Sequence, residues 1–258
     1  MRLLIVRHGE PNYEKDILTE KGQREAQLLV PHLIKENIKD FYVSPLGRAR
    51  ETAAPTLKAL GREAVTLDWL QEVTSRLDLN EHPEMEKWFP DTNRLEDGSY
   101  EKRITWDMLP EGWKNDPLYY DPVRWRETPL ARLTDVAEQY DVVTKGMDEL
   151  LASYGYVRDG QIFRTEQGNN DTIALFCHFG LTSQLLAYFW NVSPLMTIHN
   201  LVTVTSSVTE IVSEERVKGI ATFRTKRVGD TGHLREGGEP ESFFARFCES
   251  YENDWERH

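Results

Sequence analysis

Short runs of apolar and β-branched residues alternate along this chain with longer stretches of helical periodicity. Runs of this kind are typical of strands that are largely buried. They occupy the segments Leu3–Val6, Phe41–Val43, Thr172–Cys177, Val202–Ile211 and Ile220–Arg227. Strands that alternate with helices predict an α/β fold, with a mainly parallel sheet and helices on both of its faces.

Two amphipathic helices are predicted in the first third of the chain. One begins after Thr19, and the other covers residues 46–60 and stops before a glycine. Pro31 and Pro55 fall inside these stretches. Because proline lacks a backbone N–H and crowds the preceding turn, we expect each proline to kink or restart its helix.

The composition changes between Arg76 and Gly155. Four of the seven tryptophans fall in this segment, together with several prolines, and no strand-like run stands out. We therefore expect a single α/β domain over residues 1–258, into which residues 76–155 are inserted as a helical or irregular cap subdomain. A helix is expected near the end of the insert, over Asp135–Leu151, and the aromatic side chains are expected to form the insert's own core.

The overall composition is that of an ordinary globular protein, with 39% hydrophobic and 29% charged residues. A formal net charge of −12 argues against a nucleic-acid partner, because such binding depends on Lys and Arg that neutralise phosphates. Two cysteines cannot form a disulfide framework, so a cytoplasmic location is expected. The N-terminal apolar run is too short for a signal peptide, and no membrane partner is expected. The oligomeric state stays open.

Basic residues follow three of the predicted strands. The first strand leads into Arg7 and His8, the second into Arg48, and the third into His178. Ligands of open α/β sheets bind outside the carboxyl ends of the strands, so we expect these side chains at one edge of the sheet. Helix N-termini near Arg48 and His178 would add partial positive charge. The sequence therefore predicts an anion site at this edge.

These residue types suit phosphoryl transfer, in which negative charge spreads over the oxygens of the transferred group. A neutral imidazole at His8 can attack phosphorus and form a phosphohistidine, while a protonated His178 would donate to the same oxygens. Gly9 and Gly180, just after the histidines, leave room for a phosphate to approach. No His-x-x-x-His or Cys-x-x-Cys spacing occurs, so neither a metal ion nor a cofactor is expected.

Several segments, in this order, resemble motifs of the histidine phosphatase superfamily, which includes the cofactor-dependent phosphoglycerate mutases. They are Arg7-His8-Gly9-Glu10, Leu18–Ala26, Ser44–Ala53, Cys177–Gly180 and His233-Leu234. The resemblance covers roughly residues 1–75 and 165–235 and leaves the insert unmatched. It implies a phosphoglycerate mutase-like fold, with His8 as the nucleophile and with Arg7, Arg48 and His178 as the phosphate pocket.

The chain departs from the family pattern at two positions. The family often has an asparagine six residues after the nucleophile, where this chain has Glu14; Asn12 is the nearest alternative as a substrate-binding residue. Phe179 stands where the family usually has a small residue, or an aspartate that donates a proton in the acid-phosphatase branch. Arg50 is an alternative to Arg48 as the inward-facing arginine.

The general acid is the least defined member of the predicted site. The mutase branch uses a glutamate shortly after a leucine, and Glu72 fits that position, although the residues that usually follow it are absent. Glu72 is therefore the predicted general acid. Asp68, Asp78 and Glu81 remain open alternatives.

The predicted function is hydrolysis of a small phosphorylated metabolite by way of phosphohistidine. One alternative is a phosphoglycerate mutase-type transferase, which needs a cap that excludes water; the substrate-binding arginines of that type have no match in the insert. The other alternative is a catalytically weak pseudoenzyme that binds phosphorylated ligands. The intact set of basic residues argues against it.

Overall fold

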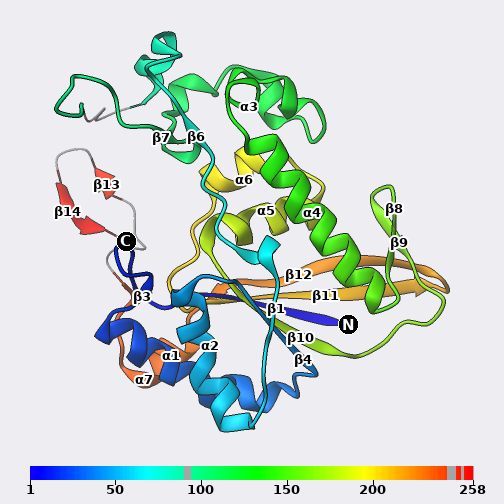
Figure 1. The fold of residues 1–258 in the computed structure, drawn as a ribbon. Coiled ribbons are helices and arrows are strands. Elements are labelled where there is room, and N and C mark those ends of the chain that lie inside the picture. Colours follow the sequence, from blue (N-terminus) through cyan, green and yellow to red (C-terminus); the bar gives the residue numbers. More distant parts are fainter. Residues whose placement is uncertain (90–93, 243–247, 251–252, 258) are drawn as a thin grey trace. The chain divides into compact units, whose positions relative to one another are not determined.

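The computed structural model describes residues 1–89, 94–242, 248–250 and 253–257 (Figure 1). The chain divides into two compact units. The first comprises Met1–Glu72, Asp148–Thr182 and Val202–His258, and the second comprises Val73–Met147 and Ser183–Leu201. The first unit holds the large sheet and all the strand-end residues singled out above. An inserted cap at residues 76–155 stays a prediction.

An eight-stranded sheet forms the centre of the first unit. Its order is β5 (Val65–Thr66), β4 (Asp40–Val43), β10 (Thr172–Cys177), β1 (Arg2–Arg7), β11 (Val208–Val217), β12 (Ile220–Asp230), β9 (Ile162–Arg164) and β8 (Val157–Asp159). The pairs from β5 to β1 are parallel and those from β1 to β8 are antiparallel. Only β11 and β9 run against the direction of β1, so the predicted α/β class with a mainly parallel sheet is confirmed.

One predicted strand begins later than expected. The pattern over Val202–Ile211 predicted extended structure throughout, but β11 starts only at Val208. Before it the backbone turns, with Ser206 in the left-handed region at a φ of 58° and its N–H bonded to the carbonyl of His8 at 2.9 Å. The β-branched residues of this segment are therefore part of a loop beside the strand ends.

Helices α1 (Glu20–Leu33) and α2 (Gly47–Leu60) pack beside each other in the first unit (Figure 1). Thr19 caps α1 by accepting the N–H of Gly22 at 3.1 Å, and α2 ends at Gly61 in the left-handed conformation. Each helix continues past its proline, so the restarts expected at Pro31 and Pro55 do not occur. A single lost N–H is tolerated there because packing holds the rest of each helix.

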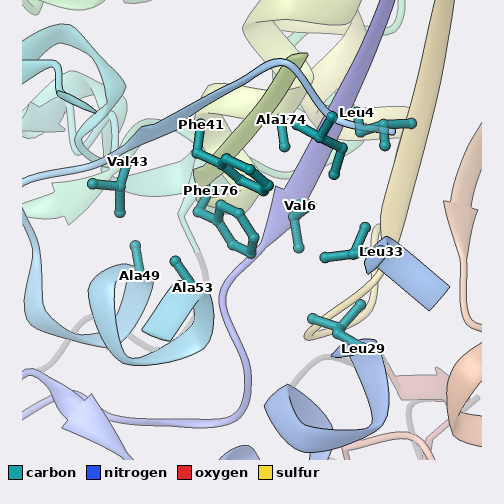
Figure 2. Packing of buried hydrophobic residues seen from close by; sticks show 11 residues of the cluster. Leu4, Val6, Leu29, Leu33, Phe41, Val43, Ala49, Ala53, Ala174 and Phe176 are labelled. Carbon is teal, nitrogen blue, oxygen red and sulfur yellow. The ribbon is translucent and has the colours of Figure 1, made fainter. Parts of the chain in front are cut away.

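The core under these helices fixes the strands that carry the site. Figure 2 shows alternate side chains of β1, β10 and β4 directed at the two helices. These side chains are Leu4, Val6, Ala174, Phe176, Phe41 and Val43 from the strands, with Leu29, Leu33, Ala49 and Ala53 from the helices. Burial of a ring such as Phe176 stabilises the fold by roughly 1.5–3 kcal/mol. The core thereby locks β1 and β10 against each other.

The second unit has a hydrophobic core of its own around Trp125 and Tyr119, both fully buried. Helices α3 (Pro129–Leu133) and α6 (Pro194–Asn200) belong to this unit. Helices α4 (Val136–Ser153) and α5 (Phe179–Trp190) each have part of their length in this unit and part in the first. The helix predicted near Asp135–Leu151 is therefore present as α4. In the described part of the chain, no helix combines the length and apolarity needed to cross a membrane.

The remaining elements are short. The strands are β2 (Pro11–Asn12), β3 (Ile17–Leu18), β6 (Arg76–Leu77), β7 (Arg103–Ile104), β13 (Cys248–Ser250) and β14 (Asn253–Arg257), and one further helix is α7 (Gly232–Gly237). Short 3-10 helices occur at Ile34–Glu36, Asp68–Leu70, Pro83–Trp88, Thr105–Asp107, Pro110–Gly112, Pro117–Tyr120 and Arg124–Glu127. Of these elements, the β2–β3 hairpin bears most on the site, because it follows His8 directly.

Candidate active site

The two histidines come together because β1 and β10 are parallel neighbours in register. Arg7 pairs with Cys177, and the N–H of His8 continues the ladder by donating to the Cys177 carbonyl at 2.9 Å. The imidazole centroids of His8 and His178 consequently lie 5.2 Å apart. Both rings are buried, at the carboxyl ends of their strands.

The hydrogen bond of His8 defines which ring nitrogen can react. Its Nδ1 lies 2.7 Å from the carbonyl oxygen of Gly9, which can only accept, so Nδ1 carries the proton. Burial, with Arg7 and Arg48 nearby, lowers the pKa of His8 well below its ordinary value. The ring is therefore neutral near pH 7, with the lone pair on Nε2.

Arg7 is held from two sides. Its guanidinium donates to the backbone carbonyl of Thr203, in the loop before β11, and lies 5.4 Å from the centre of the Phe179 ring. Phe179 thus packs against an arginine of the site. The Nε–H of Arg7 is buried and has no hydrogen-bond partner among the described residues.

Arg48 is buried near the start of α2, whereas Arg50 is exposed. Asp16 holds Arg48 by accepting from its Nη1 at 2.6 Å, and the same carboxylate accepts the N–H of Gly47 at 2.6 Å. The Nε–H of Arg48 is also buried without a partner in the described part of the chain. The arginine that faces inward is therefore the one at position 48.

His178 is anchored through Ser44, the residue that follows β4. Its Nε2 lies 2.7 Å from the Ser44 hydroxyl, while its Nδ1 is buried with no partner within the described ranges. Burial, followed by the proximity of His8, Arg48 and Arg7, lowers the pKa of His178 well below its ordinary value. When Nε2 accepts from Ser44, Nδ1 carries a proton that it can donate to an anion.

Glu72 also lies in the first unit, where its carboxyl group interacts electrostatically with Arg7 and Arg48. Its carboxylate accepts the backbone N–H groups of Gly180 and Leu181 in the first turn of α5, with 3.1 Å to the latter. Burial raises the pKa of Glu72, against the opposing effect of Arg7. A carboxyl with a raised pKa can hold a proton closer to neutral pH than an exposed one.

The alternative acids are placed differently. Asp68 and Glu81 are exposed. Asp78 lies in the second unit, where it pairs with Lys102 at 3.2 Å and accepts from Asn80. Asp78 and Glu81 belong to the second unit, and Asp68, in the first unit, has no hydrogen bond or ion pair with the histidines or arginines of the site among the described residues, so Glu72 remains the candidate for the acid.

The remaining residues proposed from the sequence shape the loop after His8. The N–H of Gly9 donates to the Thr52 hydroxyl at 2.9 Å, and a Cβ on Gly9 would lie 2.8 Å from the carbonyl oxygen of Gly22. Glycine is therefore required by close backbone approach. Asn12 uses its side-chain oxygen to accept the N–H of Lys15 at 3.2 Å within the hairpin turn, and Glu14 is exposed.

A buried carboxyl beneath the site was not identified from the sequence. Glu25 of α1 accepts the N–H of Glu10 at 2.8 Å and the Thr205 hydroxyl at 3.0 Å. It thus ties the loop after His8 to the loop that holds Arg7. Burial raises the pKa of Glu25 to about 7. Helical periodicity placed this residue beside Ala26 but gave no sign that it faces inward.

No group of three or more His, Cys, Asp or Glu side chains is arranged to hold a metal ion in the part of the chain that the structure describes. The basic groups of the site are instead arginine and histidine, which bind anions. Three buried nitrogen atoms around His8 have no hydrogen-bond partner among the described residues: Nε of Arg7, Nε of Arg48 and Nδ1 of His178. A bound ligand with acceptor oxygens would satisfy them.

Part of the chain is similar in sequence to known proteins. Residues 3–103 match the model of the histidine phosphatase superfamily (branch 1). A 2,3-bisphosphoglycerate-dependent phosphoglycerate mutase of Thermoplasma acidophilum is 32% identical over 80 residues, which cover 27% of this chain and 40% of that mutase. The chain thus matches less than half the length of this curated relative. The predicted resemblance to the superfamily is confirmed.

Solved structures share the fold over nearly the whole chain. A phosphoserine phosphatase of Entamoeba histolytica, in complex with phosphoserine, has a TM-score of 0.53 at 19% identity, covering 90% of this chain and 98% of that one. A mycobacterial glucosyl-3-phosphoglycerate phosphatase has a TM-score of 0.54 at 18% identity, covering 88% and 98%. At such identities the likeness concerns the fold alone.

The two arginines of α2 give a matched test of the anion site. Arg48→Ala removes a buried charged donor and should weaken the binding of orthophosphate about 10- to 100-fold, the effect of losing a charged hydrogen bond. Arg50→Ala removes the same charge from an exposed position and should leave binding within about twofold. Calorimetric titration measures both. The reverse ranking would show that Arg50 faces the ligand.

Glu25 should make stability depend on pH. Folding raises the pKa of the Glu25 carboxyl from an ordinary 4.5 to about 7. As pH rises, Glu25 therefore loses its proton in the unfolded chain before it does so in the folded protein. The free energy of unfolding should fall as pH rises between these two pKa values. The full effect is about 3 kcal/mol. Glu25→Gln cannot titrate, so its stability relative to wild type should improve between pH 5 and pH 8 in urea unfolding. A difference that does not change with pH would contradict this.

Proposed function

We propose, from the confirmed resemblance to the histidine phosphatase superfamily, that this chain hydrolyses phosphomonoesters of small metabolites through a phosphohistidine on His8. One observation carries the proposal: a neutral imidazole with its lone pair on Nε2 lies among buried, unpartnered N–H donors of Arg7, Arg48 and His178. Buried donors of this kind are costly unless a ligand satisfies them. A phosphoryl group supplies the acceptor oxygens that they need.

In the first step, Nε2 of His8 attacks phosphorus and the bond from phosphorus to the ester oxygen breaks. Arg7 and Arg48 stabilise the charge on the transferred oxygens, and the Nδ1–H of His178 donates to the same group. The Gly9 carbonyl stabilises the imidazolium that forms, through the proton on Nδ1. Glu72, whose pKa is raised by burial, gives its proton to the departing alcohol.

In the second step, water attacks phosphorus and the bond to Nε2 breaks. Glu72, now a carboxylate, takes the proton from that water, which returns the acid to its starting state. Orthophosphate leaves and His8 is again neutral. Every proton and electron pair is accounted for by His8, Glu72, the ester and water. The proposed route therefore needs neither a metal ion nor a cofactor.

The residues at the sheet edge recognise only the phosphoryl end of a substrate, so the rest of the ester must be read elsewhere. We assign that role to the insert at residues 76–155, as a cap subdomain of a single domain. Similar folds named as phosphatases of phosphoserine and glucosyl-3-phosphoglycerate support a small phosphorylated substrate. The low cysteine content favours a cytoplasmic location.

A second candidate is a phosphoglycerate mutase-type transferase, favoured by the partial match to the archaeal mutase. The two reactions share the first step and differ in what accepts the phosphoryl group. Transfer back to an alcohol requires water to be excluded while the phosphohistidine persists. Hydrolysis has no such requirement, so it is the simpler function for this set of residues.

The experiment is a screen of phosphorylated metabolites and an aryl phosphate, with orthophosphate release as the signal. Wild-type protein should release orthophosphate, and His8→Ala should lower kcat by at least about 10⁴-fold, because the covalent step depends on the imidazole of His8. His32→Ala, which changes a half-buried histidine paired with Glu236, is the matched control and should keep its activity.

Isomerised phosphoglycerate without orthophosphate would favour the mutase. Tight binding of phosphate esters without any turnover would instead support a pseudoenzyme. Full activity in His8→Ala would exclude the phosphohistidine route for either reaction.

A further inference from the structure

Tyr13 is the most exposed of the large hydrophobic side chains near the candidate site, with 64% of its surface open. It follows β2 in the turn of the β2–β3 hairpin, five residues beyond His8 in the chain. Exposed tyrosines in hairpin turns usually make few ordered contacts, since holding such a side chain costs rotamer entropy. Tyr13 is different, because its contacts are with the basic groups of the site.

The ring of Tyr13 contacts two of these groups. The guanidinium carbon of Arg48 lies 5.4 Å from the ring centroid, within the range of a cation–π interaction. The imidazole of His8 meets the ring nearly perpendicularly, with 6.4 Å between centroids and 86° between planes. The aromatic ring therefore lies beside both the nucleophile and one pocket arginine.

The other arginine of the site, Arg7, packs against a different ring. Its guanidinium carbon lies 5.4 Å from the centroid of Phe179, so each guanidinium has an aromatic neighbour. Phe179 is buried, whereas Tyr13 is exposed.

Two buried guanidinium groups around one imidazole repel each other and would turn apart unless something held them. Aromatic faces and a phenolic oxygen attract cations without neutralising them, unlike a carboxylate. Asp16 binds one edge of Arg48, and the Thr203 carbonyl binds one edge of Arg7. Tyr13 packs its ring on Arg48, and the buried Nε–H groups of both arginines stay available for a shared anion.

We infer that Tyr13 is a positioning residue of the phosphate pocket: its ring holds Arg48 beside His8, so that Arg48 can bind the phosphoryl group that His8 receives. This inference deepens the proposed function and rests on it. It predicts that an exposed side chain with little importance for folding controls phosphate affinity. It also predicts that this control operates through Arg48.

The test compares Tyr13→Phe and Tyr13→Leu with wild type, using orthophosphate titrated by calorimetry and the KM and kcat for an aryl phosphate. Tyr13→Phe keeps the ring, so orthophosphate should bind within about twofold of wild type. Tyr13→Leu loses the ring and should weaken binding about 3- to 10-fold. KM should rise in parallel, and the thermal midpoint should stay within about 2 °C of wild type.

A double mutant separates positioning from a general disturbance. In the Arg48→Ala background the group that Tyr13 holds is gone, so Tyr13→Leu should weaken orthophosphate binding by clearly less than it does in wild type. An equal effect in both backgrounds would overturn the positioning role. Unchanged orthophosphate affinity in Tyr13→Leu would overturn it as well.

The two proposals fail in different ways. If wild type turns over esters through His8 and Tyr13→Leu behaves like wild type, the positioning role is wrong and the function stands. If wild type binds orthophosphate and Tyr13→Leu weakens it, but no ester is hydrolysed, the function is wrong and the positioning role stands. Failure of wild type to bind orthophosphate at all would overturn both.

Discussion

The parallel pairing of β1 with β10 is the constraint on which the candidate site depends. Its register sets Arg7 opposite Cys177, so the next residue of each strand, His8 and His178, leaves the sheet at the same edge. The core below, with Phe176 at its centre, fixes that register, because a slip of one residue would turn every buried side chain to the opposite face. Two segments some 170 residues apart in the chain therefore deliver their imidazoles to within 5.2 Å.

The electrostatics of the site follow from burying two arginines beside two imidazoles. Burial and the neighbouring arginines lower the pKa of both histidines, which keeps the imidazoles neutral and leaves the positive charge on guanidinium groups. Asp16 and the Thr203 carbonyl each satisfy part of an arginine. Arginine donors without partners remain, and a phosphoryl dianion matches them in both charge and geometry. A bound dianion would raise the pKa of His178 from this lowered value, because negative charge favours the protonated ring.

The sequence predicted the parts of the site that depend on local pattern. His8 and Arg48 were found because each follows a recognisable strand. Ligands of open α/β sheets bind at the carboxyl ends of the strands, so the two residues were expected at the same edge of the sheet. Tyr13 and Asp16 were not found, because their contacts arise from the way a short hairpin folds back on α2. The loop before β11 was read as a strand for a similar reason: Thr203 and Thr205 are buried by tertiary packing near His8, not by a ladder.

If His8 is the covalent nucleophile, its phosphorylated form can be trapped during turnover. Protein mixed with a substrate and quenched in base should carry base-stable, acid-labile phosphate, located by peptide mass spectrometry. We expect the label on His8, bonded to Nε2, because Nδ1 is occupied by its proton to the Gly9 carbonyl. Product formation with His8 unlabelled, or with phosphate on another residue, would contradict it.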